Sequence, residues 1–261
     1  MDKKFLEDCL EKGMSTRDIE KICDKSRSTI SYWIKKYDLI DKSKYVKKDN
    51  YRFEKIDNKE KAYALGFILA DAAITERNTE VSVAIKDKDV VEFISKIVNG
   101  NVTYSYKFYK KTRVFPKARM MKRIIDITKF TGGMAKIDRH YPRVREDLER
   151  YLIQGLFDSD GCVTWGRRKD KNRIWQKVSF TSQLKILEGV QKYLLKKSNI
   201  STVVRPKSNE KCYVLEFANQ YDVLKFCEHI YPNEDIIILN RKYLKYKALR
   251  LELEENGEGA A

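Results

Sequence analysis

The sequence has very little histidine and no closely spaced pair of cysteines. Its two histidines are His140 and His229, and its five cysteines are scattered without a CxxC spacing. Neither a disulfide framework nor a zinc site rich in cysteine or histidine is therefore predicted. A metal in this chain would be held by carboxylates, which favours Mg²⁺ and similar hard cations.

The sequence also lacks long apolar runs and a targeting segment. It contains no stretch of about 18 consecutive apolar residues, and its N-terminal MDKKFLEDCLEKG has no signal-peptide pattern. We therefore expect a cytoplasmic, intracellular protein with no membrane partner. The apolar share of 42% and the aromatic share of 11% indicate a folded chain.

Basic residues are present in large excess. Lys and Arg number 54 against 38 Asp and Glu, which gives the chain a net charge of +16. Such an excess favours nucleic acid as the first choice of partner and an anionic membrane surface as the second. General solubility is the plain alternative.

Residues 1–40 are predicted to form a small all-α domain. Three short helices are indicated by KKFLEDCLEKG, STRDIEKIC and SRSTISYWIKK, with N-caps at Ser15 or Thr16 and at Ser26 or Ser28. Two short helices joined by a tight turn resemble a helix-turn-helix, and a three-helix bundle without a ligand is the alternative. The third helix carries side chains suited to DNA contacts: Arg27, Ser28, Thr29, Tyr32 and Lys35.

After a charged linker at 41–60, the order of the predicted elements repeats. Residues 61–140 and 141–261 each read as helix, two strands, helix, two strands and helix. One face of each hairpin is expected to pack on the amphipathic helices and the other to face outward. The predicted fold class is α+β, with two pseudo-symmetric α-β-β-α-β-β-α halves after the small all-α domain.

The first helices of the two halves have related sequences. They read YALGFILADAA at 63–73 and YLIQGLFDSDG at 151–161. Small residues four apart lie on one helix face and allow a second helix to approach closely. The predicted interface positions are Gly66 and Ala70 in the first copy, and Gly155 and Ser159 in the second.

An aspartate follows the small residues in both copies. Asp71 and Asp160 are expected at helix C-termini, where the helix dipole disfavours a carboxylate. Two such carboxylates brought together repel each other and favour a cation between them. We therefore predict that they share divalent metal ions. A simple role at the helix ends is the alternative.

These stretches resemble the signature helices of the LAGLIDADG homing endonucleases in their single-chain, two-copy form. The resemblance covers roughly residues 60–250 and is closer in the second copy. The first copy has Leu69 at the motif's first Asp and Ala72 at its last Gly. If this position requires a left-handed backbone, Ala costs about 1 kcal/mol there, so we expect a different turn or slight strain at Ala72.

The resemblance implies a monomeric, site-specific endonuclease of the kind active in intron homing. Such an enzyme recognises a long, nearly asymmetric site in double-stranded DNA. It cuts both strands across the minor groove and leaves short 3′ overhangs. The implied cofactor is Mg²⁺ or Mn²⁺, with Ca²⁺ binding but not supporting cleavage.

The resemblance also assigns residues to the site. Asp71 and Asp160, with Ala72 and Gly161 after them, are implied as the metal site. Lys86 and Gln183, at the strand ends before the amphipathic helices, are implied as further catalytic residues. Asp158 is expected to play a supporting role, because its counterpart in the first copy is Leu69.

The predicted outward strands are strongly basic. Residues 105–123 carry eight Lys or Arg and no acidic residue, and residues 165–177 carry six against one Asp. Aromatic residues between them favour a saddle along a DNA groove over a merely solvated face. The predicted DNA contacts here are Arg77, Lys107, Arg113, Arg119, Arg123, Arg167, Arg168, Arg173 and Arg205.

Three other functions remain open at this point. A non-cleaving transcription regulator would keep this fold and the helix-turn-helix, but such proteins typically lose the acidic pair that this chain retains. An RNA maturase for intron splicing would use the same saddle on structured RNA. An intein fragment is disfavoured, because the chain shows no splice-junction Cys or His-Asn.

Overall fold

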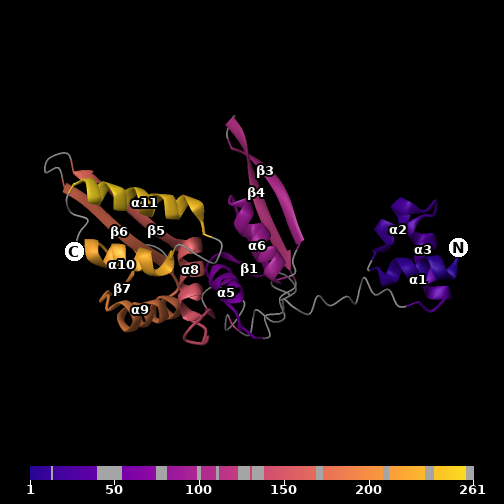
Figure 1. The fold of residues 1–261 in the computed structure, drawn as a ribbon, viewed down its shortest axis with the longest axis horizontal. Helices are drawn as coiled ribbons and strands as arrows, with labels where there is room; N and C mark the ends of the chain where they lie inside the picture. The colour runs from indigo at the N-terminus through magenta and orange to yellow at the C-terminus, as the bar shows by residue number, and fades with distance from the viewer. Residues whose placement is uncertain are drawn as a thin grey trace. The chain divides into compact units, whose positions relative to one another are not determined.

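The computed structural model describes the chain in two compact units, Met1–Asn50 and Tyr51–Ala261 (Figure 1). The described residues are 1–12, 14–39, 55–74, 81–98, 101–109, 112–122, 130, 138–168, 173–207, 212–232 and 238–256. For residues 74, 84, 101–109 and 112–122 the description is of the backbone alone. None of the helices within these ranges is both long enough and apolar enough to span a bilayer.

The described part of the first unit consists of three helices. They are α1 (Lys3–Glu11), α2 (Thr16–Ile22) and α3 (Arg27–Lys36). Ser15 caps α2 in a reciprocal pair with Asp18, and Ser26 caps α3. The three predicted helices are therefore present. Helices α2 and α3 begin after the predicted caps Ser15 and Ser26. The small core contains Leu6, Cys9, Leu10, Ile19, Ile30 and Ile34.

Six consecutive elements of the second unit recur in the same order. The first set is α5 (Lys59–Asp71), β1 (Ala73–Ile74), β2 (Val81–Ile85), α6 (Lys88–Val98), β3 (Asn101–Tyr109) and β4 (Thr112–Lys122). The second set is α8 (Glu149–Asp160), β5 (Gly161–Arg168), β6 (Arg173–Ser182), α9 (Leu184–Ser198), β7 (Val204–Pro206) and β8 (Tyr213–Phe217). Two helices follow, α10 (Gln220–Ile230) and α11 (Asn240–Glu255).

The two sheets have the same topology. Their strand orders are β1-β2-β4-β3 and β5-β6-β8-β7, and the neighbouring strands are antiparallel. The α+β class and the repeated order of elements are thus confirmed over six elements. The helix predicted to end the first half falls within 123–140, where only residues 130 and 138–140 are described.

The predicted linker at 41–60 overlaps the second unit. Helix α5 begins at Lys59, capped by the side chain of Asn58, and Ile56 is buried in the core. Asp57 pairs with Lys61 at 2.9 Å. Residues 55–60 therefore belong to the folded unit, because they supply the cap and the first turn of α5; residues 40–54 lie outside the described ranges.

Helix α5 is buried on every side. All its residues from Lys61 to Ala70 are buried, as expected for a helix whose sequence is apolar all round. It packs along α8, and the two helices stand side by side in Figure 1. The sheets flank this pair, so the central helices carry the contact between the halves.

Candidate active site at the ends of the paired helices

The backbones of α5 and α8 touch at two glycines. A Cβ added at Gly66 would collide with the carbonyl oxygen of Leu152 and lie 2.9 Å from the amide nitrogen of Leu156. A Cβ added at Gly155 would collide with the carbonyl oxygen of Tyr63 and lie 2.8 Å from the amide nitrogen of Phe67. Each glycine therefore fits between residues of the facing helix because it has no side chain.

These contacts obey a two-fold relation. The residues facing Gly66 are the third before and the first after Gly155, and the residues facing Gly155 stand in the same relation to Gly66. The other small residues of the motif, Ala70 and Ser159, lie one turn further along. Ala70 is buried, and the hydroxyl of Ser159 is buried without a hydrogen-bond partner in the described structure. The close helix pair predicted from the small residues is present at the two glycines.

The alignment of α5 with α8 that matches Gly66 with Gly155 also matches Asp71 with Asp160. These are the last residues of α5 and α8, and both are half-buried. Burial lowers the pKa of the Arg139 guanidinium, and the nearby carboxylates of Asp160 and Asp71 oppose that shift. Both carboxylates thus lie within electrostatic reach of one buried cation, so the helix pair brings the two predicted acids to one region.

Arg139 closes the C-terminus of α5. It donates hydrogen bonds to the carbonyl oxygens of Leu69 at 2.9 Å and Ala72 at 2.5 Å, and a longer one to that of Ile68 at 3.5 Å. Its side chain is only 1% exposed, and its Nε has no hydrogen-bond partner in the described structure. The last carbonyls of the helix, which have no intrahelical donor, are satisfied by this cation.

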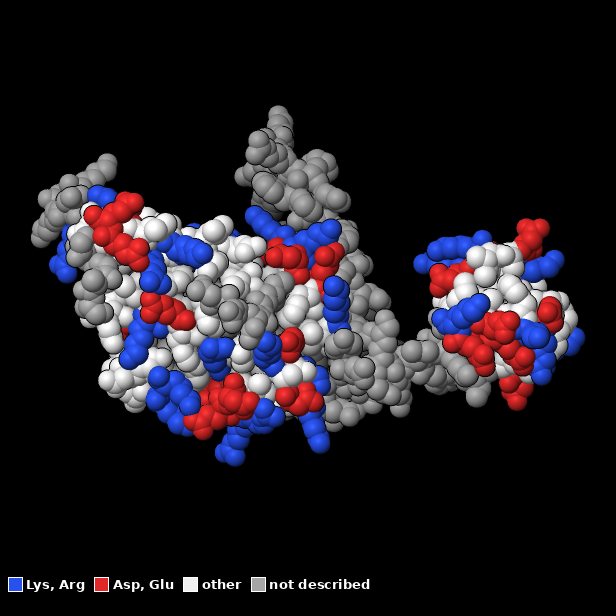
Figure 2. All heavy atoms as spheres, in the orientation of Figure 1, with Lys and Arg blue, Asp and Glu red and all other residues white. Residues whose placement is uncertain are grey.

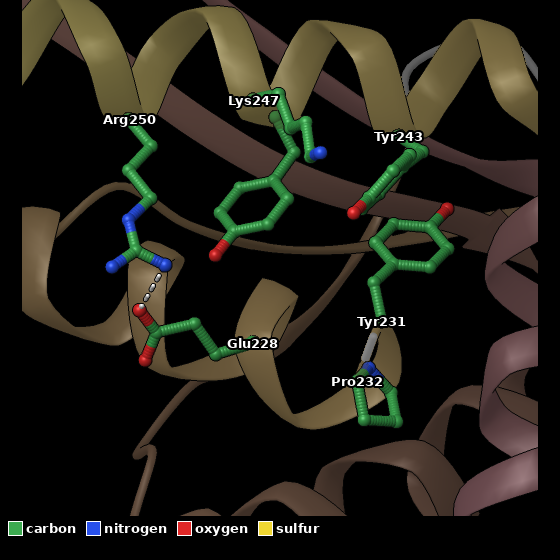
Figure 3. A pocket seen from close by; sticks show the side chains of 7 residues that line it. Glu228, Tyr231, Pro232, Tyr243, Lys247 and Arg250 are labelled. Atoms are coloured by element: carbon green, nitrogen blue, oxygen red, sulfur yellow. Dashed lines mark ion pairs between the residues drawn. The ribbon is translucent and has the colours of Figure 1, made fainter. Parts of the chain in front are cut away.

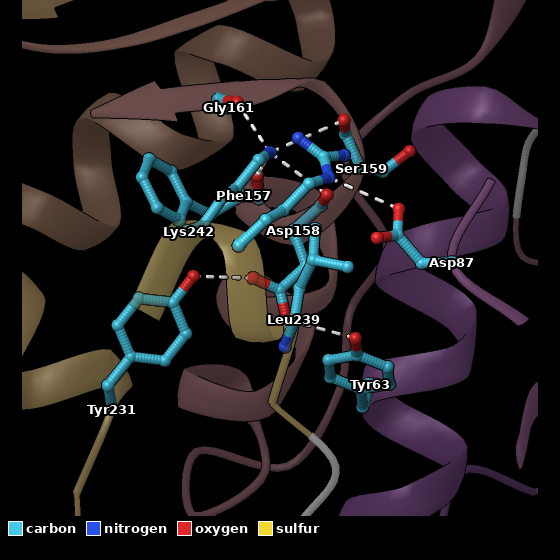
Figure 4. Close-up of polar contacts among 10 residues, drawn as sticks. Tyr63, Asp87, Phe157, Asp158, Ser159, Gly161, Tyr231, Leu239 and Lys242 are labelled. Atoms are coloured by element: carbon cyan, nitrogen blue, oxygen red, sulfur yellow. Dashed lines mark hydrogen bonds and ion pairs between the residues drawn. The ribbon is translucent and has the colours of Figure 1, made fainter. Parts of the chain in front are cut away.

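Lys242 closes the C-terminus of α8 in the corresponding way. Its Nζ donates to the carbonyl oxygens of Phe157, Asp158 at 2.9 Å, and Gly161 at 2.5 Å (Figure 4). A longer contact reaches the carbonyl of Ser159 at 3.4 Å. Burial lowers the pKa of Lys242 to about 8, against the attraction of Asp158. Neither cation was predicted from the sequence.

The positions after the two helices decide between the two expectations for Ala72, a different turn or slight strain. Ala72 has φ −68° and Gly161 has φ −78°, so both leave the helix with extended backbone and neither is left-handed. Ala72 is therefore unstrained, because each helix runs directly into a strand. The carbonyl oxygens of Ala72 and Gly161 accept from Arg139 and Lys242. The metal proposal accordingly depends on the side chains of Asp71 and Asp160.

Asp158 lies inside the helix pair. It is fully buried and accepts hydrogen bonds from the hydroxyls of Tyr231 at 2.5 Å and Tyr63 at 2.9 Å (Figure 4). A longer contact comes from the amide of Leu239 at 3.4 Å. Burial raises the pKa of Asp158 to about 6, against these hydrogen bonds and the charge of Lys242. Its position agrees with a supporting role, since it has no access to solvent.

The predicted catalytic residues Lys86 and Gln183 occupy equivalent corners. Lys86 follows β2 and is exposed, and Gln183 follows β6 and is the N-cap residue of α9. Next to Lys86, Asp87 is ion-paired with Arg241 at 3.1 Å. This ion pair connects the first half to α11, where Arg241 directly precedes Lys242.

The second sheet presents one basic face. On β6 the buried Ile174 and Val178 alternate with the exposed Arg173 and Trp175. Arg168 is in register with Arg173. Arg205 follows the same parity, because it pairs with Val214, which in turn pairs with Thr181. Three predicted DNA contacts therefore share the face that points away from the helices.

Arg167 lies on the opposite face of this sheet. It is in register with the buried Ile174, and its guanidinium is ion-paired with Glu252 of α11. Trp165, two residues earlier, donates from its indole nitrogen to the carbonyl oxygen of Lys245 at 3.1 Å. The structure thus separates Arg167 from the outward basic face, and its contact is with the protein.

The first sheet is described in less detail. Arg77 and Arg123 lie outside the described residues, while Lys107, Arg113 and Arg119 lie in β3 and β4, where only the backbone is described. Arg119 pairs in register with Ala84 and with Thr103. On the face shown in Figure 2, basic and acidic side chains of the described residues are mixed.

Most of the predicted contact residues of α3 are accessible. The exposed ones are Arg27, Ser28, Tyr32 and Lys35, and Thr29 is half-buried. Arg27 is ion-paired with Glu20 of α2 at 3.0 Å, so this side chain is already engaged. The hydroxyls of Ser28 and Thr29 lie 2.8 and 3.0 Å from that of Ser26.

A cavity of about 170 Å³ lies between α10 and α11 (Figure 3). Its walls are largely aromatic, and its one carboxylate, Glu228, pairs with Arg250 at 3.5 Å. This lining does not resemble a metal site. The lining residues are Glu228, Tyr231, Pro232, Tyr243, Tyr246, Lys247 and Arg250.

Comparison with known proteins identifies the fold. Residues 147–231, from the start of α8 to the end of α10, match the family described as LAGLIDADG-like domain. The resemblance seen in the sequence is thus confirmed over these residues of the second half. No curated protein is significantly similar to the chain in sequence.

Solved structures extend the likeness to both halves. The homing endonuclease I-WcaI bound to its DNA recognition sequence matches with a TM-score of 0.51 and 16% identity, over 72% of this chain and 87% of that chain. The LAGLIDADG meganuclease I-AabMI bound to uncleaved DNA matches with a TM-score of 0.50 and 11% identity, over 77% and 93%. The N-terminal LAGLIDADG domain of DUF199/WhiA matches with a TM-score of 0.48 and 13% identity, over 74% and 92%. At such identities the first two matches show a shared fold.

Proposed function

We propose that the chain is a site-specific double-strand DNA endonuclease that uses divalent metal. The observation that carries this proposal is the equivalence of Asp71 and Asp160, which end two helices related by the glycine contact. A carboxylate at a helix C-terminus is unfavourable unless a cation offsets it. Both halves place this carboxylate at the same position and within electrostatic reach of a buried cation, which supports a functional reason for it.

The donor set suits Mg²⁺ or Mn²⁺. Aspartate oxygens are the preferred ligands of these ions. No group of three or more His, Cys, Asp or Glu side chains gathers within the described ranges, so the proposal depends on this pair of aspartates. Asp71 and Asp160 would hold the metal, one from each half. When bound, the metal would activate water for attack on the scissile phosphate and stabilise the departing oxygen.

One carboxylate from each half suits a duplex with two antiparallel strands. We propose that Asp71 serves one strand and Asp160 the other, across the minor groove, leaving short 3′ overhangs. Lys86 and Gln183 are proposed to lie near the phosphates, since they occupy equivalent corners of the halves. Both motif helices belong to one chain, so a monomer is proposed as the active form.

DNA is proposed to lie along the outward sheet faces. Arg168, Arg173 and Arg205 share such a face with the exposed Trp175, a combination suited to phosphates and sugars. Arg168→Ala should weaken DNA binding and reduce the slope of log K against log salt by about 1. The neighbouring Arg167→Ala is the matched control, because its guanidinium binds Glu252. Equal slopes for the two variants would remove this face from the DNA surface.

The first unit is proposed to add a second DNA contact. Residues 1–40 would act as a helix-turn-helix, with Ser28, Tyr32 and Lys35 of α3 toward the DNA. Arg27 would have to exchange its ion pair with Glu20 for a phosphate, a modest cost for an exposed pair. This contact would lengthen the recognised sequence beyond that covered by the sheets.

A library of randomised DNA targets tests the endonuclease directly. The full chain is incubated with the library in Mg²⁺, Ca²⁺ or EDTA, and the cut ends are sequenced. We expect one long preferred site cut on both strands in Mg²⁺, and binding without cutting in Ca²⁺. Tight binding with both strands intact in Mg²⁺ and Mn²⁺ would instead assign the chain to the non-cleaving DNA-binding regulators.

A further inference from the structure

The cavity between α10 and α11 is lined by three tyrosine rings. The ring centroids of Tyr231 and Tyr246 lie 6.5 Å apart, with an interplanar angle of 26°. The ring of Tyr243 lies 5.7 Å from that of Tyr231 and 6.4 Å from that of Tyr246. The volume of about 170 Å³ is similar to that of an engineered cavity of about 150 Å³ that binds benzene. The space therefore suits a ligand built on one six-membered ring, which would pack against aromatic walls.

Two of these rings are held by the rest of the fold. Tyr231 is 3% exposed, and its hydroxyl donates to the carboxylate of Asp158 at 2.5 Å. Tyr246 is 4% exposed, and its hydroxyl is hydrogen-bonded to Arg250. The walls are thus in place before a ligand enters, which lowers the entropy cost of binding.

The charge of the lining favours an anion. The lining contains two cations, Lys247 and Arg250, and one carboxylate, Glu228. Glu228 pairs with Arg250 at 3.5 Å, at the end of the cavity away from Tyr231 and Tyr243 (Figure 3). Among the described residues Lys247 has no acidic partner, and its ammonium lies 4.9 Å from the centre of the Tyr243 ring. The charge of Lys247 therefore remains to be balanced.

Tyr246 supplies a second donor next to Lys247 on α11. Its hydroxyl accepts from the guanidinium of Arg250, so its own proton remains for another acceptor. Burial raises the pKa of Tyr246 to about 12, so the hydroxyl keeps this proton at neutral pH. A hydroxyl and an ammonium on consecutive residues are suited to the two oxygens of a carboxylate.

An organic cation is the alternative ligand for a cage of aromatic rings with a carboxylate. Both features of such a cage are already used by cations of the protein itself. Lys247 lies over the ring of Tyr243, and Arg250 pairs with Glu228. A further cation would have to displace one of them, so the observations favour an anion.

The cavity is also separate from the basic face proposed for DNA. Helix α11 lies on the inner side of the second sheet, where Trp165 and Arg167 contact it. Arg168 and Arg173 belong to the opposite face. A duplex along that outward face would not reach the cavity, so its ligand would be a free small molecule.

We propose that this cavity is a binding site for a small monocyclic aromatic carboxylate. The ring would lie among the three tyrosines, and the carboxylate would bind Lys247 and the hydroxyl of Tyr246. The proposal does not depend on the endonuclease function, and the failure of either leaves the other standing. Because Tyr231 bonds to Asp158 of α8, a ligand against its ring should also stabilise the packing of α10 and α11 on the central helices.

Binding of para-fluorobenzoate to the full chain, followed by fluorine NMR, tests the site. We expect saturable binding with a Kd between about 10 μM and 1 mM, as suits a ligand of this size. Fluorobenzene has the ring without a charge, and para-fluorobenzylamine carries the opposite charge. Both should bind about 10-fold more weakly or worse, since they lose a hydrogen bond to a charged group.

Reversing one charge locates the bound probe. Lys247→Glu should weaken para-fluorobenzoate binding about 10-fold or more and strengthen that of para-fluorobenzylamine. Lys245→Glu is the matched control, because Lys245 is an exposed lysine of the same helix outside the lining; its affinity should stay within about twofold. Tyr246→Phe, which removes only the hydroxyl, should weaken binding about 5-fold.

Thermal unfolding gives a second readout of the same site. The probe should raise the Tm of the wild type and of Lys245→Glu, and leave that of Lys247→Glu unchanged, because a ligand stabilises only the folded state that binds it. Absence of saturable binding at millimolar probe overturns the proposal. Tighter binding of para-fluorobenzylamine than of para-fluorobenzoate by the wild type overturns it in favour of an organic cation. Equal losses in Lys247→Glu and Lys245→Glu place the probe elsewhere and also overturn it.

Discussion

Helices α5 and α8 agree at some positions and differ at others. Both have a glycine against the backbone of the other helix, an aspartate as the last residue, and a buried cation on the closing carbonyls. They differ two residues before the end of each helix, where Leu69 of α5 corresponds to Asp158 of α8. The positions that α5 and α8 share are those at which the two-fold packing of the helices restricts the choice of residue.

The difference shows how the halves depend on each other. Asp158 accepts from Tyr63 of the first half and from Tyr231 of the second, and its carboxylate faces the charge of Lys242. Leu69 simply packs in the core. The buried carboxylate of this contact is thus supplied by the second half, with Leu69 at the corresponding place of the first, so the two motif helices should respond differently to substitution there.

Asp158→Leu should have the largest effect on stability. The variant gives α8 the residue of α5, leaves the hydroxyls of Tyr63 and Tyr231 without their acceptor, and removes the carboxylate near Lys242. Removing one partner of a buried charge pair costs about 3–5 kcal/mol. Urea unfolding monitored by circular dichroism measures the free energy of unfolding.

The control for this variant is Leu69→Ala, which only creates a cavity in the other helix, at about 2–5 kcal/mol. A second control, Asp158→Asn, keeps one oxygen as acceptor and should lose less than Asp158→Leu. If Asp158→Leu is as stable as the wild type, the polar contact is not needed to join the halves.

Gly66→Ala and Gly155→Ala should destabilise the protein to the same extent. Each added Cβ meets a main-chain carbonyl, which cannot turn aside, so the helices must separate. Overpacking of this kind costs about 3 kcal/mol. Thermal and urea unfolding of the two variants measure the loss.

Gly166→Ala is the matched control for the glycine pair. Its added Cβ would lie 3.1 Å from the indole of Trp175, an exposed side chain that can move. We expect a change within about 0.5 kcal/mol. A loss at Gly66 or Gly155 no greater than at Gly166 would contradict the backbone contact.

The stability of the pair should depend on pH through Asp158. Its pKa is raised from 3.8 to about 6, so the folded state retains a proton that the unfolded state has released. The corresponding stability is present below pH 4 and is lost as the pH rises to 6, on the order of 2–3 kcal/mol. Asp158→Asn should lack this loss, so the difference between the two unfolding profiles isolates it. A constant difference from pH 4 to 7 would show that the carboxyl titrates normally.

Much of the fold could be predicted because its signals are local. The glycines and aspartates stand in one short motif, and alternation marks Val81 and Val83 as the inner positions of β2. The sequence also indicates the face of Arg167, because Arg167 and the buried Val163 are separated by an even number of residues on one strand and therefore point to the same side. The basic composition of the hairpin nevertheless groups Arg167 with the outward residues in the prediction from sequence.

The buried cations could not be predicted in the same way. Arg139 follows a turn-rich stretch without periodicity, and Lys242 lies in the first turn of α11, a helix in which basic residues occur on several faces. Their partners are carbonyl groups far away in the sequence, and main-chain acceptors leave no mark in the residue types. The backbone after Asp71 shows the different turn expected at Ala72, because the helix leads straight into a strand without a left-handed residue.

Cleavage by Asp71→Asn and Asp160→Asn tests the central claim most directly, namely that equivalent carboxylates from both halves form one metal-dependent site. Each variant is compared with wild type on the selected target in Mg²⁺, with DNA affinity measured in Ca²⁺. We expect both variants to lose double-strand cutting while DNA affinity stays within about twofold, since an isosteric change leaves the basic faces intact. Undiminished double-strand cutting by either variant would contradict the account.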